Sequence, residues 1–379
     1  MTSADLDMLG RKADARSAEI ESLRRLPDDL AADLVATGLC RALAPAEVGG
    51  PEMAVAELVD AVERLAYWDG ATAWCGMISA TTSLLGGHLP EEWVEPIFGP
   101  PGSVTGGYAA PVGRATPSED GLVVTGRWQW GSGTAHCTWI GGGTRLVGPD
   151  GEPTRRSDGL AAPFVFFAPD QVELADTWYT AGLRGTGSTD YSVTAATVPE
   201  GRWVQLGGPA SIDRRLYRFP FYGALAVGVA TVCLGLARRA VAELVELAAD
   251  KRPAQSTRTL AERSVVQAQV AEAEAAQRSA RALLDATVAG ATEAAAVGEI
   301  TGEQRRLVRL AATNAALQAA HAVDLCYHAG GGSSVYESSP LQRVFRDVHV
   351  ATQHAMVAPR TYEVLGRAAL GLPTDLSQI

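Results

Sequence analysis

One histidine near the end of the chain follows an arginine and an aspartate at regular spacings. Arg343 and Asp347 are four residues apart, and His354 comes seven residues after Asp347. In a helix these spacings place all three side chains on one face. An imidazole titrates near neutral pH and is suited to donate or accept a proton. A helical histidine is also common as a polar core residue, and Arg343 with Asp347 is typical of an ordinary ion pair, so both interpretations stay open.

The segment that carries these residues is expected to be a helix with a defined start. Ser339 is a typical N-cap residue, Pro340 suits the first helical position, and Gln342 completes a capping box with Ser339. The glycine run at 330–332 precedes the segment. Because glycine lacks a side chain, this run lets the backbone approach a ligand or a neighbouring chain closely.

The composition describes an ordinary globular protein. Of the 379 residues, 47% are hydrophobic and 20% are charged. A net charge of -11 argues against nucleic acid as a partner, because phosphate binding needs a basic surface. The polar N-terminus shows no secretory signal, and the cysteines stand singly without metal-site spacing: Cys40, Cys75, Cys137, Cys233 and Cys326. We therefore expect a cytoplasmic protein with reduced, buried thiols and no metal.

An apolar run from Phe219 to Ala237 raises the question of a membrane span, because it approaches the ~20 residues that a span needs. The run is rich in glycine and alanine, contains Pro220 and Tyr222, and has no second run of its kind beside it. These features favour a helix buried on all sides in a bundle, and no membrane contact is expected.

The order of predicted elements divides the chain into three domains and an α+β fold. Residues 1–99 show helical spacing of apolar residues, residues 100–208 show short alternating strands, and residues 209–379 return to helices. The expected helices are Ala13–Leu26, Pro27–Thr37, Met53–Trp68, Ala71–Gly86, Arg214–Ala249, Leu260–Thr292, Thr301–Ala329 and the segment from Pro340. The sequence thus predicts a helical domain, a small β-barrel or sandwich, and a four-helix bundle of long antiparallel helices.

This order and three local motifs resemble the acyl-CoA dehydrogenase fold over nearly the whole chain. The first motif is Gly-Arg-Trp-Gln-Trp-Gly-Ser-Gly at 126–133, which is similar to the family's strand and turn against the flavin ring. The second is Gly-Leu-Arg-Gly-Thr-Gly-Ser-Thr-Asp at 182–190, followed by Val-Pro-Glu at 198–200. The third is the segment that ends in Arg346-Asp347. The three motifs stand in the family's order and separation.

Acyl-CoA dehydrogenation requires a carboxylate base, and its usual positions hold no suitable acid here. The family's position two residues before Pro340 is Ser338, and the neighbouring Glu337 points in another direction on a helix. The alternative position lies early in the first bundle helix, yet no acid occurs between Asp213 and Glu243. A dehydrogenase with a displaced base remains an alternative, but this chemistry is disfavoured.

The spacing Arg346-Asp347, six residues, His354 is similar to that of two-component flavin-dependent monooxygenases of this fold, such as hydroxyphenylacetate hydroxylase and dibenzothiophene monooxygenase. The resemblance implies reduced FMN or FAD from a separate NAD(P)H:flavin reductase, O2, a C4a-hydroperoxyflavin, a homotetramer and a hydrophobic, ring-bearing substrate. The same fold would also suit an amino-sugar N-oxygenase or a flavin-free scaffold protein.

The resemblance also assigns roles to individual residues. His354 is expected to hydrogen-bond the oxygenated flavin or supply a proton, with action as a base toward the substrate as a further option. Ser132 occupies the position whose hydroxyl faces flavin N5, although a turn serine bonded within its own loop would fit the sequence too. Trp130 and Gly133 are expected beside the ring.

The remaining assignments concern the flavin phosphates and the substrate. Arg252 and Ser256, with Gly331 and Gly332 from a neighbouring subunit, are expected at the phosphates, where arginine can donate two parallel hydrogen bonds. Expected substrate contacts are Trp74, His136, Tyr217 and Phe221. The chain has no GxGxxG after a first strand, so no pyridine nucleotide site is expected.

Overall fold

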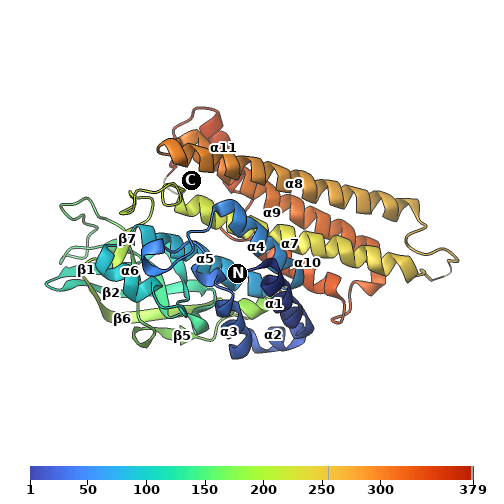
Figure 1. Ribbon diagram of the computed structural model, residues 1–379, viewed down its shortest axis with the longest axis horizontal. Coiled ribbons are helices and arrows are strands. Elements are labelled where there is room, and N and C mark those ends of the chain that lie inside the picture. The colour runs from blue at the N-terminus through green and yellow to red at the C-terminus, as the bar shows by residue number, and fades with distance from the viewer. Residues whose placement is uncertain (255, 377–378) are drawn as a thin grey trace.

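The computed structural model describes residues 1–254, 256–376 and 379. Figure 1 shows N-terminal helices and C-terminal helices, with a sheet formed by the residues between them in sequence. The predicted α+β fold is confirmed. Helices before the sheet are α1 (Ser3–Ala15), α2 (Ser17–Leu23), α3 (Asp28–Ala36), α4 (Val55–Trp68), α5 (Gly70–Ser83) and α6 (Glu91–Phe98). The prediction of one helix over Ala13–Leu26 was wrong, because Arg16 has non-helical backbone angles and separates α1 from α2.

The central sheet is mixed and has the order β5-β6-β2-β1-β3-β4-β7. Its strands are β1 (Thr105–Ser118), β2 (Gly121–Gly131), β3 (Trp139–Leu146), β4 (Pro163–Phe167), β5 (Glu173–Ala175), β6 (Thr189–Pro199) and β7 (Trp203–Gln205). Strands β1 and β3 pair in parallel, and the other pairs are antiparallel. Trp128 anchors the interior: its ring stacks on Tyr191, and its Nε1 donates to the Gly143 carbonyl at 2.8 Å.

The helices after the sheet are α7 (Phe221–Asp250), α8 (Ser264–Val297), α9 (Gly302–Gly330), α10 (Pro340–Ala351) and α11 (Thr361–Ala369). In Figure 1, α7, α8 and α9 form one long layered bundle. The start of α9 is confirmed, since Thr301 and Gln304 form the predicted capping box. The first bundle helix begins at Phe221 instead of Arg214, because Pro220 forms its N-terminal boundary.

Helix α7 is long and apolar enough to cross a membrane, but 89% of its most apolar stretch is buried within the protein. It packs against α4, α5, α9 and α10. The apolar run predicted from Phe219 to Ala237 is therefore the core of the bundle, as expected for a helix that is hydrophobic all round.

Helix α10 differs from its prediction in three respects. The Ser339 side chain makes no capping hydrogen bond, and the Gln342 side chain accepts from Arg346 Nε at 3.0 Å instead. The fourth bundle helix is short, because it ends at Ala351. His354 consequently lies in the turn beyond α10 and does not extend the face that carries Asp347.

Arg343 and Asp347 face other parts of the chain and do not form the ordinary helical ion pair. Arg343 Nη2 donates to Asp14 Oδ1 of α1 at 2.6 Å. Asp347 Oδ1 accepts from the backbone N–H of Leu183 at 2.6 Å. Helix α10 is thereby tied to the N-terminal helices on one side and to the sheet domain on the other.

The segment 181–188, which we call the glycine turn, meets α10 at very close range. Arg346 donates to the Ala181 carbonyl and pairs with Glu21 at 2.7 Å. A Cβ atom at Gly182 would lie 2.2 Å from the backbone oxygen of Arg346. Since backbone atoms on both sides cannot move apart cheaply, only glycine fits at position 182.

The Asp347 carboxyl is buried, and burial raises its pKa to about 7 despite the opposing effects of the Leu183 N–H and the Arg343 charge. An unfolded aspartate titrates near 4, so the folded protein binds this proton more tightly. The stability contributed by the protonated form is full below about pH 4 and is lost as the pH rises to about 7.

We predict that Asp347→Asn removes this pH dependence. Asparagine keeps the acceptor for Leu183 but does not ionise, so the variant should gain stability relative to wild type, by up to about 4 kcal/mol, as the pH rises from 4 to 7. Chemical denaturation at several pH values measures the difference. The exposed Asp120→Asn is the control, and a difference that stays constant with pH would contradict the prediction.

Gly182→Ala is predicted to destabilise the protein by about 3 kcal/mol, because its Cβ atom would overlap the Arg346 backbone. The control is Gly366→Ala on the exposed face of α11, where an added Cβ atom meets nothing within 4 Å. That change should stabilise the helix by about 1 kcal/mol. Thermal unfolding of both variants tests the pair, and equal effects would refute the role given to Gly182.

Candidate functional site

A chain of buried hydroxyl groups joins the end of β2 to the glycine turn. Ser132 Oγ lies 2.7 Å from Ser188 Oγ, and Ser188 Oγ lies 2.6 Å from Thr186 Oγ1. Thr186 donates in turn to the Leu183 carbonyl at 2.8 Å. Leu183 is the residue whose N–H binds Asp347, so the position of Ser132 depends on the contact between the glycine turn and α10.

The backbone of two turns makes this arrangement possible. Gly133 follows Ser132 with a φ of +69°, and its N–H donates to the Thr186 carbonyl at 2.8 Å. Gly187 has a φ of +53°, immediately before Ser188. Both are left-handed conformations that favour glycine, and they turn the two serine side chains toward each other.

Trp74 of α5 contacts both of the residues to which catalysis was assigned. Its Nε1–H donates to Ser132 Oγ at 2.9 Å, and its ring lies edge-on to the His354 imidazole with 5.6 Å between centroids. Ser132 is therefore held by α5 and the glycine turn, and not by its own loop. The structure brings Ser132, Trp74 and His354 together from three regions of the chain.

The imidazole of His354 is fixed in one tautomer. Its Nδ1 atom accepts from the Met356 N–H at 3.3 Å, so the ring proton is on Nε2. Burial, and to a lesser degree the positive charge of Arg309, lowers the pKa of His354 to about 4. At neutral pH this side chain is thus an uncharged hydrogen-bond donor.

Trp130 presents an indole ring to the surface near Ser132. Its side chain is 55% exposed, its φ is +60°, and its ring lies edge-on to Tyr108. His136 lies in the turn that follows Gly133 and borders a small cavity with Ser132. The His136 Nε2 atom is 3.0 Å from the Leu26 carbonyl, and burial lowers the pKa of His136.

Two other expected substrate residues flank the start of α7. Tyr217 is buried, and its hydroxyl donates to Glu52 Oε1 at 3.0 Å. Phe221 is buried as well and lies edge-on to Tyr222. Through Glu52, the Tyr217 hydroxyl is tied to the loop before α4. The charge of Arg309 acts on both Tyr222 and His354, so the start of α7 and the His354 turn share this neighbour.

The residues expected at the flavin phosphates gather at one end of the bundle, where α7 and α9 end and α8 begins (Figure 1). Lys251 donates to the Gly330 carbonyl and joins the two loops. Arg252 donates to the Thr257 carbonyl at 2.9 Å, and Ser256 bonds within the same loop. Helix α10 begins at this end, and His354 follows its other end. The expected phosphate residues are therefore apart from Ser132 and His354 within one chain.

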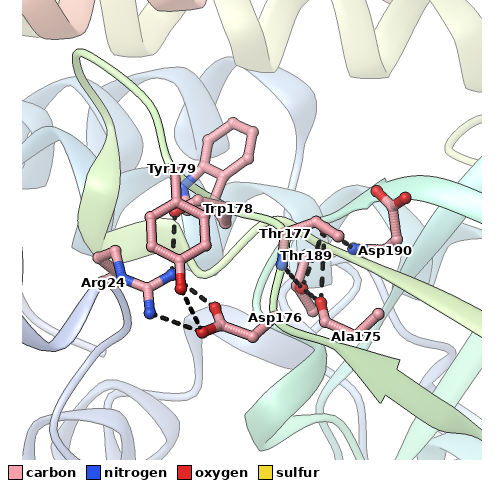
Figure 2. Close-up of polar contacts among 8 residues, drawn as sticks. All are labelled: Arg24, Ala175, Asp176, Thr177, Trp178, Tyr179, Thr189 and Asp190. Atoms are coloured by element: carbon pink, nitrogen blue, oxygen red, sulfur yellow. Dashed lines mark hydrogen bonds and ion pairs between the residues drawn. The ribbon is translucent and has the colours of Figure 1, made fainter.

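An open pocket of about 220 Å³ is lined by Gly187 of the glycine turn and by residues at the end of α2 and around β5. Figure 2 shows how its wall is fixed: Arg24 forms a two-point ion pair with Asp176 and lies over the Tyr179 ring, 4.0 Å from its centre. Thr177 and Thr189 link the neighbouring strands β5 and β6. These contacts anchor the end of α2 to the sheet domain beside the site.

The sequence analysis did not identify two residues that lie next to Ser132 and to the His354 turn. Ser188 stands within the second motif, but nothing in its spacing indicates that it reaches Ser132. Arg309 is buried on the same face of α9 as Ala312 and Thr313. A charged residue at an apolar helical position is the signal that could have identified it.

The side chains present fit a flavin ring. An exposed indole supplies a flat apolar surface at Trp130, two residues before Ser132 at the end of β2. The Ser132 hydroxyl and the His354 imidazole both contact Trp74. Glycines 331 and 332 leave the space around their backbone open, with no protein atom nearer than 4.0 Å to an added Cβ atom, as binding of a phosphate near backbone atoms requires.

Comparison with known proteins agrees with this geometry. Residues 227–359 match the family described as acyl-CoA dehydrogenase, C-terminal domain. An indole-3-acetate monooxygenase of Pseudomonas putida is 32% identical over 360 residues, which cover 94% of this chain and 90% of that protein.

Solved structures extend the similarity to the whole fold. The crystal structure of the HsaA monooxygenase from Mycobacterium tuberculosis, named as a flavin-dependent oxygenase subunit, has a TM-score of 0.90 at 27% identity and covers 100% of this chain and 98% of its own. XiaF from a Streptomyces species, in complex with FADH2 and glycerol, has a TM-score of 0.88 at 26% identity, over 98% of this chain and 96% of its own. The predicted class and cofactor are confirmed: the chain belongs to the flavin-dependent monooxygenases of the acyl-CoA dehydrogenase fold, which use reduced flavin and O2.

Proposed function

We propose that this chain is the oxygenase component of a two-component system and hydroxylates a hydrophobic aromatic substrate. A separate NAD(P)H:flavin reductase would supply the reduced FMN or FAD. The observation that carries the proposal is the contact of one indole, Trp74, with both Ser132 and His354. The relatives support it through their names, which include an oxygenase subunit and an indole-3-acetate monooxygenase.

Bound reduced flavin would supply the oxygen chemistry by reacting with O2. The protein's contribution is positioning and control of protons. In this proposal Ser132 would hydrogen-bond the flavin ring at N5, and the contacts of its hydroxyl with Trp74 and Ser188 support a fixed orientation. Trp130 and Gly133 provide the surface beside the ring.

His354 acts as a hydrogen-bond donor through Nε2–H in this proposal. Its Nδ1 atom is engaged by Met356, and its lowered pKa keeps the ring neutral at physiological pH. A neutral donor stabilises charge that develops on a nearby oxygen without releasing a proton. The option that His354 acts as a base through Nδ1 is not supported, because that lone pair already accepts a hydrogen bond.

The substrate would bind on the His354 side of Trp74, with Phe221 and His136 as further walls. Their aromatic character matches a flat, apolar ring system. Tyr217 supports this region by packing against Gly87 and does not present its hydroxyl to the substrate. An amino sugar carries more polar groups than this lining offers, which makes N-oxygenation of such a substrate the second choice.

The flavin phosphates would bind to a second copy of the chain. Arg252, Ser256, Gly331 and Gly332 lie at the bundle end from which α10 starts, and the 12 residues of α10 span roughly 18 Å toward His354. Because the two groups lie apart within one chain, a flavin that contacts both would bridge two subunits. A homotetramer is the assembly that we propose.

We predict that His354→Ala shortens the lifetime of the flavin–oxygen adduct by roughly 10 to 100-fold, the effect of losing one hydrogen bond to a charged group. Anaerobic protein with reduced FMN or FAD is mixed with O2, and absorbance follows the decay to oxidised flavin. His349→Ala is the matched control, since His349 binds Asp324 on α9. Equal lifetimes in wild type and His354→Ala would refute the role of His354, and an adduct that never forms in wild type would refute the proposed function.

Arg252→Ala is predicted to weaken flavin binding by roughly 10 to 100-fold, because a charged hydrogen bond to phosphate is lost. Arg258→Ala in the same loop is the control. Equilibrium titration with reduced flavin under anaerobic conditions measures both affinities. Unchanged affinity in Arg252→Ala would remove this loop from the site.

Mixed oligomers test whether the site crosses subunits. Arg252→Ala and His354→Ala chains are co-expressed with different tags, and hybrid oligomers are purified by both tags. The reduced flavin is kept too dilute to fill Arg252→Ala sites. If the site is shared, some sites in the hybrid contain an intact Arg252 from one chain and an intact His354 from the other, and a long-lived adduct should reappear. Hybrids with only short-lived adduct would show that both residues act within one chain.

A further inference from the structure

Arg309 places a guanidinium group inside an alanine-rich bundle helix. Its side chain is only 3% exposed, and burial lowers its pKa to about 10. Val308, Ala311 and Ala312 around it on α9 are buried apolar residues. Transfer of a charged group from water to such surroundings is costly unless it makes well-placed hydrogen bonds. We therefore expect the buried guanidinium of Arg309 to make hydrogen bonds that matter for the structure or the function of the protein.

The guanidinium holds the turn that contains His354. Arg309 Nη2 donates to the Met356 carbonyl at 3.0 Å, and the N–H of the same Met356 donates to His354 Nδ1 at 3.3 Å. Two further bonds tighten this turn, because the N–H groups of Val357 and Ala358 donate to the His354 carbonyl at 2.9 and 3.0 Å. The orientation of Met356 thus links Arg309 to the imidazole.

The occupied Nδ1 atom determines what His354 can offer. An imidazole that accepts at Nδ1 carries its proton at Nε2 and can donate there only. The groups packed around it support this state. Arg309 of α9 is the charged neighbour, Tyr222 of α7 is within the electrostatic influence of Arg309, and α5 contributes the uncharged Trp74. The ring is therefore constrained by the Met356 turn and by the edge-on indole.

We propose that Arg309 is a positioning residue that selects the Nε2–H tautomer of His354 by holding the Met356 carbonyl. Without this bond the 354–358 turn loses its tie to α9, the Met356 N–H no longer stays on Nδ1, and both tautomers become populated. The value of Nε2–H as a donor rests on the proposed function. The control of the tautomer by Arg309 is a property of the protein alone.

The experiment reads the tautomer directly. The full-length protein is labelled with 15N-histidine, and the ring nitrogen shifts of His354 are recorded between pH 5 and 8 without flavin. A His354→Asn sample identifies the signals of this residue among the six histidines. The variants are Arg309→Met, which removes the donor and the charge, and Arg309→Gln, whose shorter amide does not reach the Met356 carbonyl. Arg281→Met is the control, because Arg281 is a partly buried arginine of α8 that pairs with Asp60 and Glu63.

In wild type and Arg281→Met we expect one tautomer, with Nδ1 unprotonated, and no protonation above pH 5. In either Arg309 variant we expect a mixture of tautomers and a His354 pKa above that of wild type, because the neighbouring positive charge is lost while the burial of the ring remains. The proposal is overturned if folded Arg309 variants keep the wild-type tautomer, or if Arg281→Met mixes the tautomers as strongly.

This measurement separates the inference from the proposed function. It requires neither flavin nor O2, so a protein that forms no oxygen adduct can still show the predicted change of tautomer. Conversely, a long-lived adduct in wild type with unchanged tautomers in Arg309→Met and Arg309→Gln would uphold the monooxygenase and reject the role of Arg309.

Discussion

The hydrogen bond from the Leu183 N–H to the buried Asp347 carboxyl joins the two halves of the site. Leu183 begins the hydroxyl chain that ends at Ser132, and Asp347 belongs to the helix that leads to His354. A displacement of α10 against the glycine turn would change the relation between Ser132 and His354. Gly182 permits this contact because the backbones of the two segments nearly touch.

Buried charges around α10 extend this constraint to the N-terminal helices. Asp14 of α1 accepts from both Arg343 and Arg239, and Arg239 also pairs with Glu243. Breaking one member of such a network leaves another charge buried without compensation, which costs several kcal/mol. Helices α1, α7 and α10 are therefore fixed to one another by directional contacts, in addition to their apolar packing. The geometry of the site depends on parts of the chain far from it in sequence.

Local signals predicted the parts of the fold that local interactions determine. The start of α9 is one example, because Thr301 and Gln304 satisfy each other without help from the rest of the chain. The start of α10 is a counterexample. Gln342 was expected to cap the helix, but Arg346 engages its side chain while also reaching Ala181 and Glu21. The tertiary contacts of Arg346 therefore determine that the Gln342 side chain bonds Arg346 and does not cap the helix.

In the candidate site, too, some features could be predicted from the local sequence and others depend on tertiary contacts. The positions of Ser132 and His354 followed from motifs similar to a known family, whereas their common neighbour Trp74 was assigned only to the substrate. The end of α10 before His354 could not be predicted from spacing, since the turn that follows it accepts a hydrogen bond from Arg309, which is 45 residues before His354 in the chain. Ser188 and Ser132 are separated by 56 residues and meet only through the fold of the sheet domain.

The double contact of Trp74 limits how this protein can diversify. A smaller side chain at position 74 would enlarge the space beside His354, but it would also remove the donor to Ser132 and the ring that packs on the imidazole. In the proposed substrate site, natural selection for a bulkier substrate would act more readily on Phe221 at the start of α7, because its side chain has no hydrogen-bonding group. We expect descendants with new specificities to keep the indole at position 74 and to vary the side chain at position 221.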